Sequence, residues 1–517
     1  MEESSRTKKS MLNITSNFII QIMKTVLAFV TRTVFIKVLG EQYLGVNGLL
    51  SNILLMLSLT ELGVSTAINF SLYKPLAEKD DVKISSLMTF YKKAYRIIGF
   101  TVAALGMILF FFLDYLIKDA QAIQNLNIIY LLYLANTVST YFISYKETLI
   151  YADQKSYKLT TINFVFTLLI NIGQVIILLV TKNYILYLVT QFIITFLQKL
   201  FVNIFITRKY NYINFNSEEK LEQSDLDVLK TNVKSMFFHK IGDYCINGTD
   251  NIIISKFIGI AKVGIYSNYL TLINVANTFI NLIYVGITAS LGNYIVTENT
   301  ENKVKLFRKL DFIGFIIFGT SSLLFLNLFN PFILVWIGEV YLLPMYLVLI
   351  IVLNFYLTGM RLPISTLKSA AGIYRQDRFS PLIQAAINLV ISIVLVRYLN
   401  LLGILLGTII SSLLVPCWQR PYIVYKYIFK TSVKQYYLQY IKYFIILTIS
   451  GIITYLITTN IWNVNNIFTI IANFFIVVTV HALIVIIVFR KTDEFRYIVD
   501  FTKEFIGKML NRFKNTR

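Results

Sequence analysis

Cysteine, histidine and charged side chains are all scarce in this chain of 517 residues. Its two cysteines (Cys245 and Cys417) and two histidines (His239 and His481) are too few for a disulfide framework or a cluster of metal ligands. Charged residues make up 15%, whereas soluble proteins carry about 25%. The sequence also contains no Walker A phosphate loop, GxSxG elbow or HExxH motif. It therefore does not resemble a water-soluble enzyme, an ATPase or a secreted disulfide scaffold.

Long apolar segments fill the chain instead. Hydrophobic residues make up 56% and the mean hydropathy is +0.66. Because about 20 mostly apolar residues span a bilayer, we predict fourteen spans, several of them interrupted by polar residues. They are 11–37, 44–72, 88–113, 124–150, 157–181, 184–207, 231–258, 263–296, 309–336, 341–371, 380–398, 401–427, 438–459 and 465–489.

The spans divide into two sets of six and a final pair, because the longest connection, about 208–230, is rich in charge. We predict an all-α integral membrane protein with about 14 transmembrane helices in two pseudo-symmetric six-helix bundles plus two extra C-terminal spans. The predicted parts are an N-terminal bundle (1–210), a loop (211–229), a C-terminal bundle (230–430), two further spans (431–490) and an amphipathic tail (491–517). The alternative for the tail is an ordinary solvated segment.

The distribution of Lys and Arg predicts the orientation. The chain has 48 Lys and Arg against 27 Asp and Glu, a net charge of +21. If the N-terminus is cytoplasmic, 38 of the 48 lie on the cytoplasmic side and six on the outer side. Positive residues favour the cytoplasmic side. We therefore expect a multi-pass protein of the bacterial cell (plasma) membrane with both termini in the cytoplasm. This bias accounts for most of the charge without a nucleic acid partner.

The two halves contain an internal repeat. Lys37-x-x-Gly40-x4-Gly45 has a counterpart in the second half, Lys256-x-x-Gly259-x4-Gly264, with one constant offset between the paired positions. A second match relates Lys146…Tyr151-x-Asp153 to Lys368…Tyr374-x-x-Asp377 at nearly the same offset. Six spans is an even number, so the second bundle keeps the orientation of the first, as in transporters built from parallel repeats.

Polar residues inside the predicted spans mark the candidate site, since ionisable groups at membrane depth are costly. On the first span these are Gln21, Lys24, Thr31 and Arg32, and on the seventh Lys240, Asp243, Asn247, Asp250 and Asn251. The offset of the repeat also relates these two stripes, which favours two helices facing one shared cavity. The alternatives are interhelical hydrogen bonds or a buried pair such as Lys24–Asp243. Arg32 and Asp250 are also candidates for positions near the outer interface.

Three further residues have two open roles each. Glu61, in the second span, is a candidate proton or cation site or a partner of Lys24. Arg361 precedes Pro363, where we expect a kink, and is either a cavity cation or an anchor at the inner surface. His239 is either a titrating group or a packing residue.

Three blocks of sequence resemble a known family. They are FIKVLGEQYLGVNGLLSNILLMLSLTELGVSTAI with SLYKPLAEKD (35–80), HKIGDYCINGTDNIIISKFIGIAKVGIYSNY (239–269) and KSAAGIYRQDRFSPLI (368–383). They are similar to bacterial polysaccharide biosynthesis flippases of the Wzx-like polysaccharide transporter family. That family shares a superfamily with multidrug and toxin extrusion transporters and the lipid II flippase. The resemblance implies a V-shaped cavity, alternating access, and transfer of undecaprenyl-diphosphate-linked oligosaccharide to the outer leaflet for capsule or surface polysaccharide.

The implied cargo assigns roles to the polar residues. A diphosphate crossing a low-dielectric layer needs cationic partners. We assign Lys24, Arg32, Lys240, Arg361, Gln21 and Asn247 to the cavity, and Glu61, Asp243, Asp250 and His239 as candidates for ion coupling. No cofactor is expected beyond H⁺ or Na⁺. The expected partners are the lipid-linked oligosaccharide and membrane lipids, with a polymerase and other assembly proteins as further candidates.

Three other functions remain open. A multidrug or cation antiporter of the same superfamily is expected to have a more acidic cavity. A teichoic acid or lipid II flippase differs only in cargo. A membrane-embedded polysaccharide polymerase needs a long outer loop, and the predicted outer loops are short.

Overall fold

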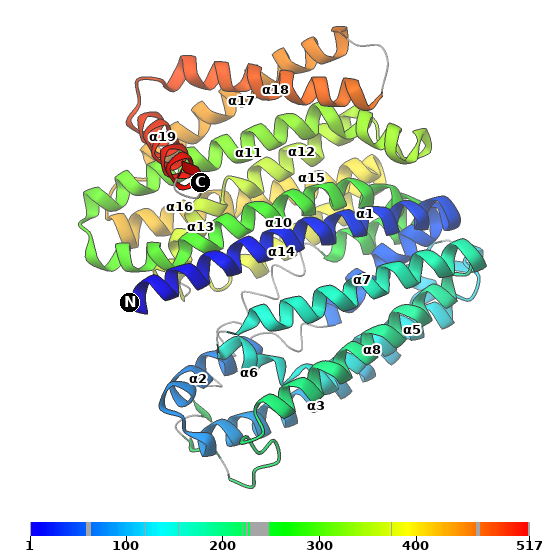
Figure 1. Cartoon of the computed structure of the whole chain (residues 1–517). Coiled ribbons are helices and arrows are strands. Elements are labelled where there is room, and N and C mark those ends of the chain that lie inside the picture. Colours follow the sequence, from blue (N-terminus) through cyan, green and yellow to red (C-terminus); the bar gives the residue numbers. More distant parts are fainter. Residues whose placement is uncertain are drawn as a thin grey trace. The chain divides into compact units, whose positions relative to one another are not determined.

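In a computed structural model, the described part of the chain is built from helices alone (Figure 1). It covers residues 2–57, 64–118, 120–153, 155–219, 221–223, 226–227, 248–373, 375–461 and 466–514. The chain divides into two compact units, Met1–Ser267 and Asn268–Arg517. The bundle bounds given above from the sequence stay predictions.

Unit 1 is a bundle of long helices with short connecting turns. Its helices are α1 (Glu2–Leu57), α2 (Val64–Glu78), α3 (Asp81–Phe110), α4 (Leu113–Leu116), η2 (Ala120–Ala122), α5 (Leu126–Ser144), α6 (Glu147–Ala152), α7 (Ser156–Thr181) and α8 (Tyr184–Lys209). Helix α7 packs against α1 and α8, and α5 packs against α3 and α8 (Figure 1). Unit 1 also includes the first turns of α10 (Ile260–Thr297).

Helix α1 is interrupted at Gly40. This residue has φ 78° and ψ −173°, a conformation that glycine adopts readily and other residues rarely do. The interruption separates the predicted spans 11–37 and 44–72, which would otherwise form one unbroken rod.

Unit 2 is arranged around a central helix, α11 (Thr300–Ile337), which follows the larger part of α10. The other elements are η3 (Glu339–Tyr341), α12 (Met345–Gly359), α13 (Leu362–Ala370), η4 (Arg375–Asp377), α14 (Ser380–Leu399), α15 (Leu401–Leu414), α16 (Pro416–Val424), η5 (Tyr425–Phe429), α17 (Lys434–Ile461), α18 (Ile467–Phe489) and α19 (Asp493–Lys514). Helix α11 packs against α12, α17 and α18, while α14 and α15 form a hairpin whose second helix packs on α12.

Eleven helices in the described residues are long and apolar enough to cross a membrane. The predicted spans 44–72 and 231–258 extend beyond the described residues, and α10 is not among the eleven. The coarser prediction, an all-α membrane protein with many spans, is confirmed, and the exact number of fourteen stays a proposal.

Two predicted features lie near helix ends, and the kink at Pro363 is confirmed. The tenth span is broken between α12 and α13, with Pro363 in the first turn of α13, where its missing N–H leaves no bond unmade. The predicted tail (491–517) coincides with a helix, α19, and its amphipathic role stays a prediction.

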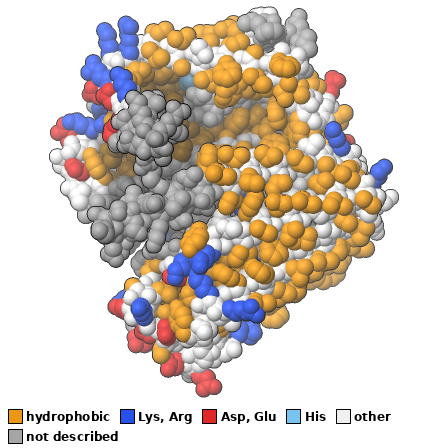
Figure 2. All heavy atoms as spheres, in the orientation of Figure 1, with side chains coloured by type: hydrophobic (Ala, Val, Ile, Leu, Met, Phe, Trp, Pro, Cys, Tyr) orange, Lys and Arg blue, Asp and Glu red, His pale blue; other side chains and the backbone are white. Residues whose placement is uncertain are grey.

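Apolar side chains dominate the outer surface of the helices. Phe111, Val180 and Phe468 are each more than three-quarters exposed. Figure 2 shows apolar side chains covering the flanks of the helices and charged side chains gathered near their ends. An exposed apolar surface of this extent suits a lipid environment and not water.

Candidate functional site

The predicted stripe on α1 begins with Gln21 and Lys24. Both side chains are half-buried. Lys24 makes no hydrogen bond or ion pair with any residue in the described part of the chain. A half-buried ammonium group without a counter-charge is costly in a membrane, so this position favours an anionic ligand or a partner beyond the described residues.

Two turns further along α1, the stripe contacts other helices of unit 1. Thr31 is buried, and its hydroxyl donates to Oδ1 of Asn171 on α7 at 2.7 Å. The Arg32 guanidinium donates to the hydroxyl of Ser267 on α10 at 2.7 Å. These bonds match the interhelical alternative for this end of the stripe, so Arg32 is held in place by the protein itself.

Aromatic side chains surround this end of α1. Phe35 packs edge-on against Tyr184 and Tyr187 of α8, with ring centroids 5.4 and 5.3 Å apart. Tyr184 also shares a hydrogen bond of 3.0 Å with Tyr133 of α5. Arg32 interacts electrostatically with Tyr187, so the guanidinium lies near this aromatic group.

Half of the predicted site lies outside the described residues. These residues are Glu61, His239, Lys240, Asp243 and Asn247. Asp250 and Asn251, which correspond to Thr31 and Arg32 in the repeat, are described, and both are buried in helical residues 248–257. The proposed pairing of the two stripes across one cavity therefore stays a prediction.

Arg361 lies at the break between α12 and α13 and is only 7% exposed. Its guanidinium donates to Thr358 Oγ1 at 3.1 Å and contacts the sulfur of Cys417 at 3.5 Å. Its Nε atom has no hydrogen-bond partner among the described residues. Arg361 is therefore buried among protein side chains, and both roles expected for it stay predictions.

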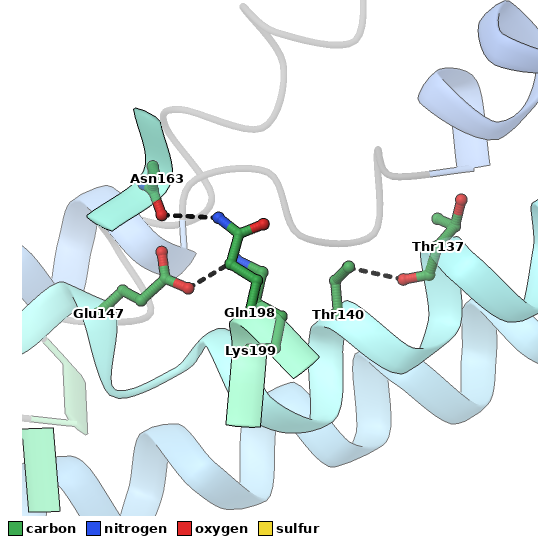
Figure 3. A network of polar contacts seen from close by, with 6 residues as sticks. All are labelled: Thr137, Thr140, Glu147, Asn163, Gln198 and Lys199. Atoms are coloured by element: carbon green, nitrogen blue, oxygen red, sulfur yellow. Dashed lines mark hydrogen bonds and ion pairs between the residues drawn. The ribbon is translucent and has the colours of Figure 1, made fainter. Parts of the chain in front are cut away.

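A polar network that the sequence did not predict joins α6, α7 and α8 in unit 1 (Figure 3). Lys199 forms an ion pair with Glu147 at 2.6 Å, and Gln198 donates to Asn163 at 2.8 Å. Gln174 of α7 also donates to Gln191 of α8, at 3.1 Å. The regular spacing of polar residues along these two apolar helices is the signal in the sequence from which such interhelical contacts could be predicted. Lys199 is therefore an internal ion-pair partner and not a free cation.

The second match of the internal repeat relates Lys146 and Asp153 of unit 1 to Lys368 and Asp377 of unit 2. These residues have different contacts in the two units. In unit 2, the ammonium group of Lys368 pairs with Asp377, and both side chains are buried. In unit 1, Lys146 instead donates to Asn203 and Thr207, each at 2.6 Å. Asp153 pairs with Lys155 and accepts a hydrogen bond from Tyr210. Burial, together with that bond, raises the pKa of Tyr210 well above its usual range.

Two features of unit 2 were not predicted from the sequence. Asp311, on α11, is buried, although it lies close to the basic start of the predicted ninth span. In addition, an apolar cavity of about 530 Å³ lies among α11, α12 and α17. Its lining includes Leu323, Leu326, Leu349, Val352, Leu447 and Ile452.

Solved structures with a similar fold are membrane transporters. The chain is similar to the lipid II flippase MurJ in an inward closed conformation, with a TM-score of 0.64 and 15% identity over 92% of this chain and 98% of MurJ. It is also similar to an inward-facing multidrug resistance MATE family transporter of the MOP superfamily, with a TM-score of 0.62 and 14% identity over 81% of this chain and 99% of that one. A third similar structure is that of a mutant of the Vibrio cholerae MATE transporter VcmN. Its TM-score is 0.55 and its identity 13%, over 84% of this chain and 99% of VcmN.

The class defined by these comparisons is the MurJ- and MATE-like membrane fold. A model of the family described as "Polysaccharide biosynthesis protein" matches residues 10–288, more than half of the chain. The chain therefore belongs to the polysaccharide biosynthesis protein family, and the resemblance stated from the sequence is confirmed. No curated protein matches the sequence.

Proposed function

We propose that this protein is a flippase that moves an undecaprenyl-diphosphate-linked oligosaccharide from the inner to the outer leaflet of the bacterial cell membrane. The observation that carries the proposal is Lys24, a half-buried cation on α1 with no counter-charge among the described residues of a polysaccharide biosynthesis family member. A diphosphate supplies the missing negative charge. The similar structure of MurJ belongs to a lipid II flippase, and lipid II is another lipid-linked sugar.

The proposed cargo has three chemically different parts, and we assign each part to residues of matching chemistry. Lys24, Gln21 and Arg361, with Lys240 beyond the described residues, are the proposed diphosphate partners. Tyrosine and phenylalanine are abundant enough (34 and 40) to offer stacking surfaces for sugar rings. The apolar cavity of unit 2 has the chemistry to hold part of a polyprenyl tail.

Transport of this kind needs alternating access and an energy source. We propose coupling to H⁺ or Na⁺, with Glu61, Asp243, Asp250 and His239 as the candidates from the sequence. Asp250 is buried, which suits a group whose charge is neutralised during the cycle. The N- and C-termini are proposed to face the cytoplasm, where the precursor is made.

Reconstitution into liposomes tests the proposal. The purified protein is placed in vesicles with a fluorescent undecaprenyl-diphosphate oligosaccharide, and an impermeant sugar-oxidising reagent reports which leaflet holds the label. We expect protein-dependent exposure of the label in both leaflets, faster with an ion gradient. A multidrug antiporter would instead move a fluorescent organic cation in the same vesicles and leave the lipid-linked sugar in place.

A further inference from the structure

Unit 2 also contains a polar cavity, whose lining includes none of the residues assigned above to the diphosphate. It has a volume of about 430 Å³ and lies among α11, η5, α17 and α19. Asp311 lines it and is 3% exposed. The Oδ1 atom of Asp311 has no hydrogen-bond partner, and its carboxylate forms no ion pair, within the described part of the chain.

The two cations beside the cavity have other partners. Arg308 is one turn before Asp311 on α11, and its guanidinium donates to Oε1 of Gln435 at 2.6 Å. Lys442 on α17 has its ammonium nitrogen 4.7 Å from the centre of the Phe489 ring. Neither cation forms an ion pair with Asp311. Burying a lone carboxylate costs so much that it is either protonated or joined by a counter-ion.

The surroundings of Asp311 are rich in hydroxyl groups. Tyr425 (η5), Tyr436 and Tyr443 (α17) line the cavity with it. Tyr284 (α10), Tyr356 (α12) and Tyr440 (α17) lie further out and interact with it electrostatically. The hydroxyls of Tyr284, Tyr356 and Tyr440 are buried and have no hydrogen-bond partner among the described residues. The remaining charged group lining the cavity is Glu494 of α19.

The fold brings the Tyr284 hydroxyl toward one face of α11. Asp311 and Gly314 are one helical turn apart, so they lie on the same side of the helix. A Cβ atom at Gly314 would be 3.2 Å from the Tyr284 hydroxyl and 2.7 Å from Cγ of Pro363. Glycine at this position therefore allows Tyr284 and the start of α13 to approach α11 next to the carboxylate.

We propose that Asp311 and the surrounding tyrosine hydroxyls form a binding site for one monovalent cation, either a proton or Na⁺. Hard cations take oxygen ligands, which is what this site offers. Asp311 is the buried carboxylate of the lining, whereas Glu494 is only partly buried, so the site balances a single positive charge. The described residues contain no group of three acidic, His or Cys side chains that would hold a metal ion of higher charge. Cation binding is measured without cargo, so the site does not depend on the flippase proposal.

The test compares full-length protein in detergent before and after the substitution Asp311→Asn. The first arm measures the thermal unfolding midpoint while Na⁺ replaces choline at constant ionic strength, because a ligand of the native state raises that midpoint. The second arm records infrared spectra over a pH series in choline and looks for the carbonyl band of a protonated carboxyl. The matched control is Glu301→Gln, which removes an exposed acid from the same helix.

A Na⁺ site predicts that the midpoint rises with Na⁺ in the wild type and in Glu301→Gln, with the rise lost in Asp311→Asn. A proton site predicts no response to Na⁺ but a protonated-carboxyl band that Asp311→Asn alone removes. The proposal is overturned if Na⁺ has no effect and no such band disappears, or if Asp311→Asn keeps the wild-type response. If Asp311→Asn does not fold, Tyr356→Phe keeps the carboxylate and removes one hydroxyl. Tyr356→Phe is then expected to change either the rise of the unfolding midpoint with Na⁺ or the position of the infrared band. If both stay as in the wild type, the result counts against the site.

Discussion

Gly45 of α1 and Gly264 of α10 pack against each other through reciprocal contacts within unit 1. A Cβ atom at Gly45 would lie 2.0 Å from the carbonyl oxygen of Ile260, and one at Gly264 would lie 2.3 Å from the carbonyl oxygen of Glu41. Gly45 with Gly264, and Glu41 with Ile260, are equivalent positions of the sequence repeat. The sequence repeat therefore marks a contact between equivalent segments of α1 and α10.

The reciprocity predicts equal sensitivity at the two glycines. Gly45→Ala and Gly264→Ala each force a methyl group into a carbonyl, and overpacking of this kind costs about 1–3 kcal/mol. We expect both variants to lower the thermal unfolding midpoint by similar amounts. Gly48→Ala is the control, since its Cβ would meet Val263 at an ordinary 3.6 Å. A tolerated alanine at 45 or 264 would disprove the close contact.

The α14–α15 hairpin depends on a second close approach. Gln384 pairs with Ser412 and Asn388 with Thr408, and between the helices a Cβ atom at Gly407 would lie 2.9 Å from the backbone nitrogen of Ser392. Small residues permit such interhelical packing in membranes. Gly407→Ala should therefore separate the helices and lower the unfolding midpoint. The same change at Gly507, where nothing lies within 4 Å, should leave it equal or higher.

The Lys368–Asp377 ion pair predicts a non-additive mutant cycle. Removing one partner leaves a buried, uncompensated charge, which costs about 3–5 kcal/mol. We expect Lys368→Met and Asp377→Asn to be poorly stable as single variants and the double variant to be more stable than either. Thermal unfolding of all four proteins measures the coupling. Additive losses would mean that the pair contributes no interaction of its own.

The proposed orientation predicts opposite labelling at two ends of unit 1. Glu78 ends α2 on the proposed cytoplasmic side, and Lys182 follows α7 on the proposed outer side. In intact cells, a membrane-impermeant thiol reagent should label Lys182→Cys and leave Glu78→Cys at the level of the parent protein. The reverse pattern would invert the topology. Labelling of both in permeabilised cells is the control for accessibility.

The sequence predicted the features that recur at regular spacing. The family, the predicted helices within the described residues, the kink near Pro363 and the repeated glycines all leave periodic or local signals. The surroundings of Asp311 left no such signal, because they are tyrosines from α10, α12, η5 and α17, all distant from it in the sequence. Similarly, whether a lysine such as Lys199 on α8 is free depends on Glu147, which lies on α6. Long-range partners are set by packing, which a single sequence does not display.

The central claim, that Lys24 holds the diphosphate of a lipid-linked sugar, is tested by transport in liposomes. Losing a hydrogen bond to a charged group costs about 1.5–3 kcal/mol, so Lys24→Ala should slow flipping roughly tenfold to a hundredfold. Lys37→Ala, an exposed position on the same helix, should keep the wild-type rate, and Lys24→Arg should restore part of it. Equal transport by the wild type, Lys24→Ala and Lys37→Ala would contradict the account.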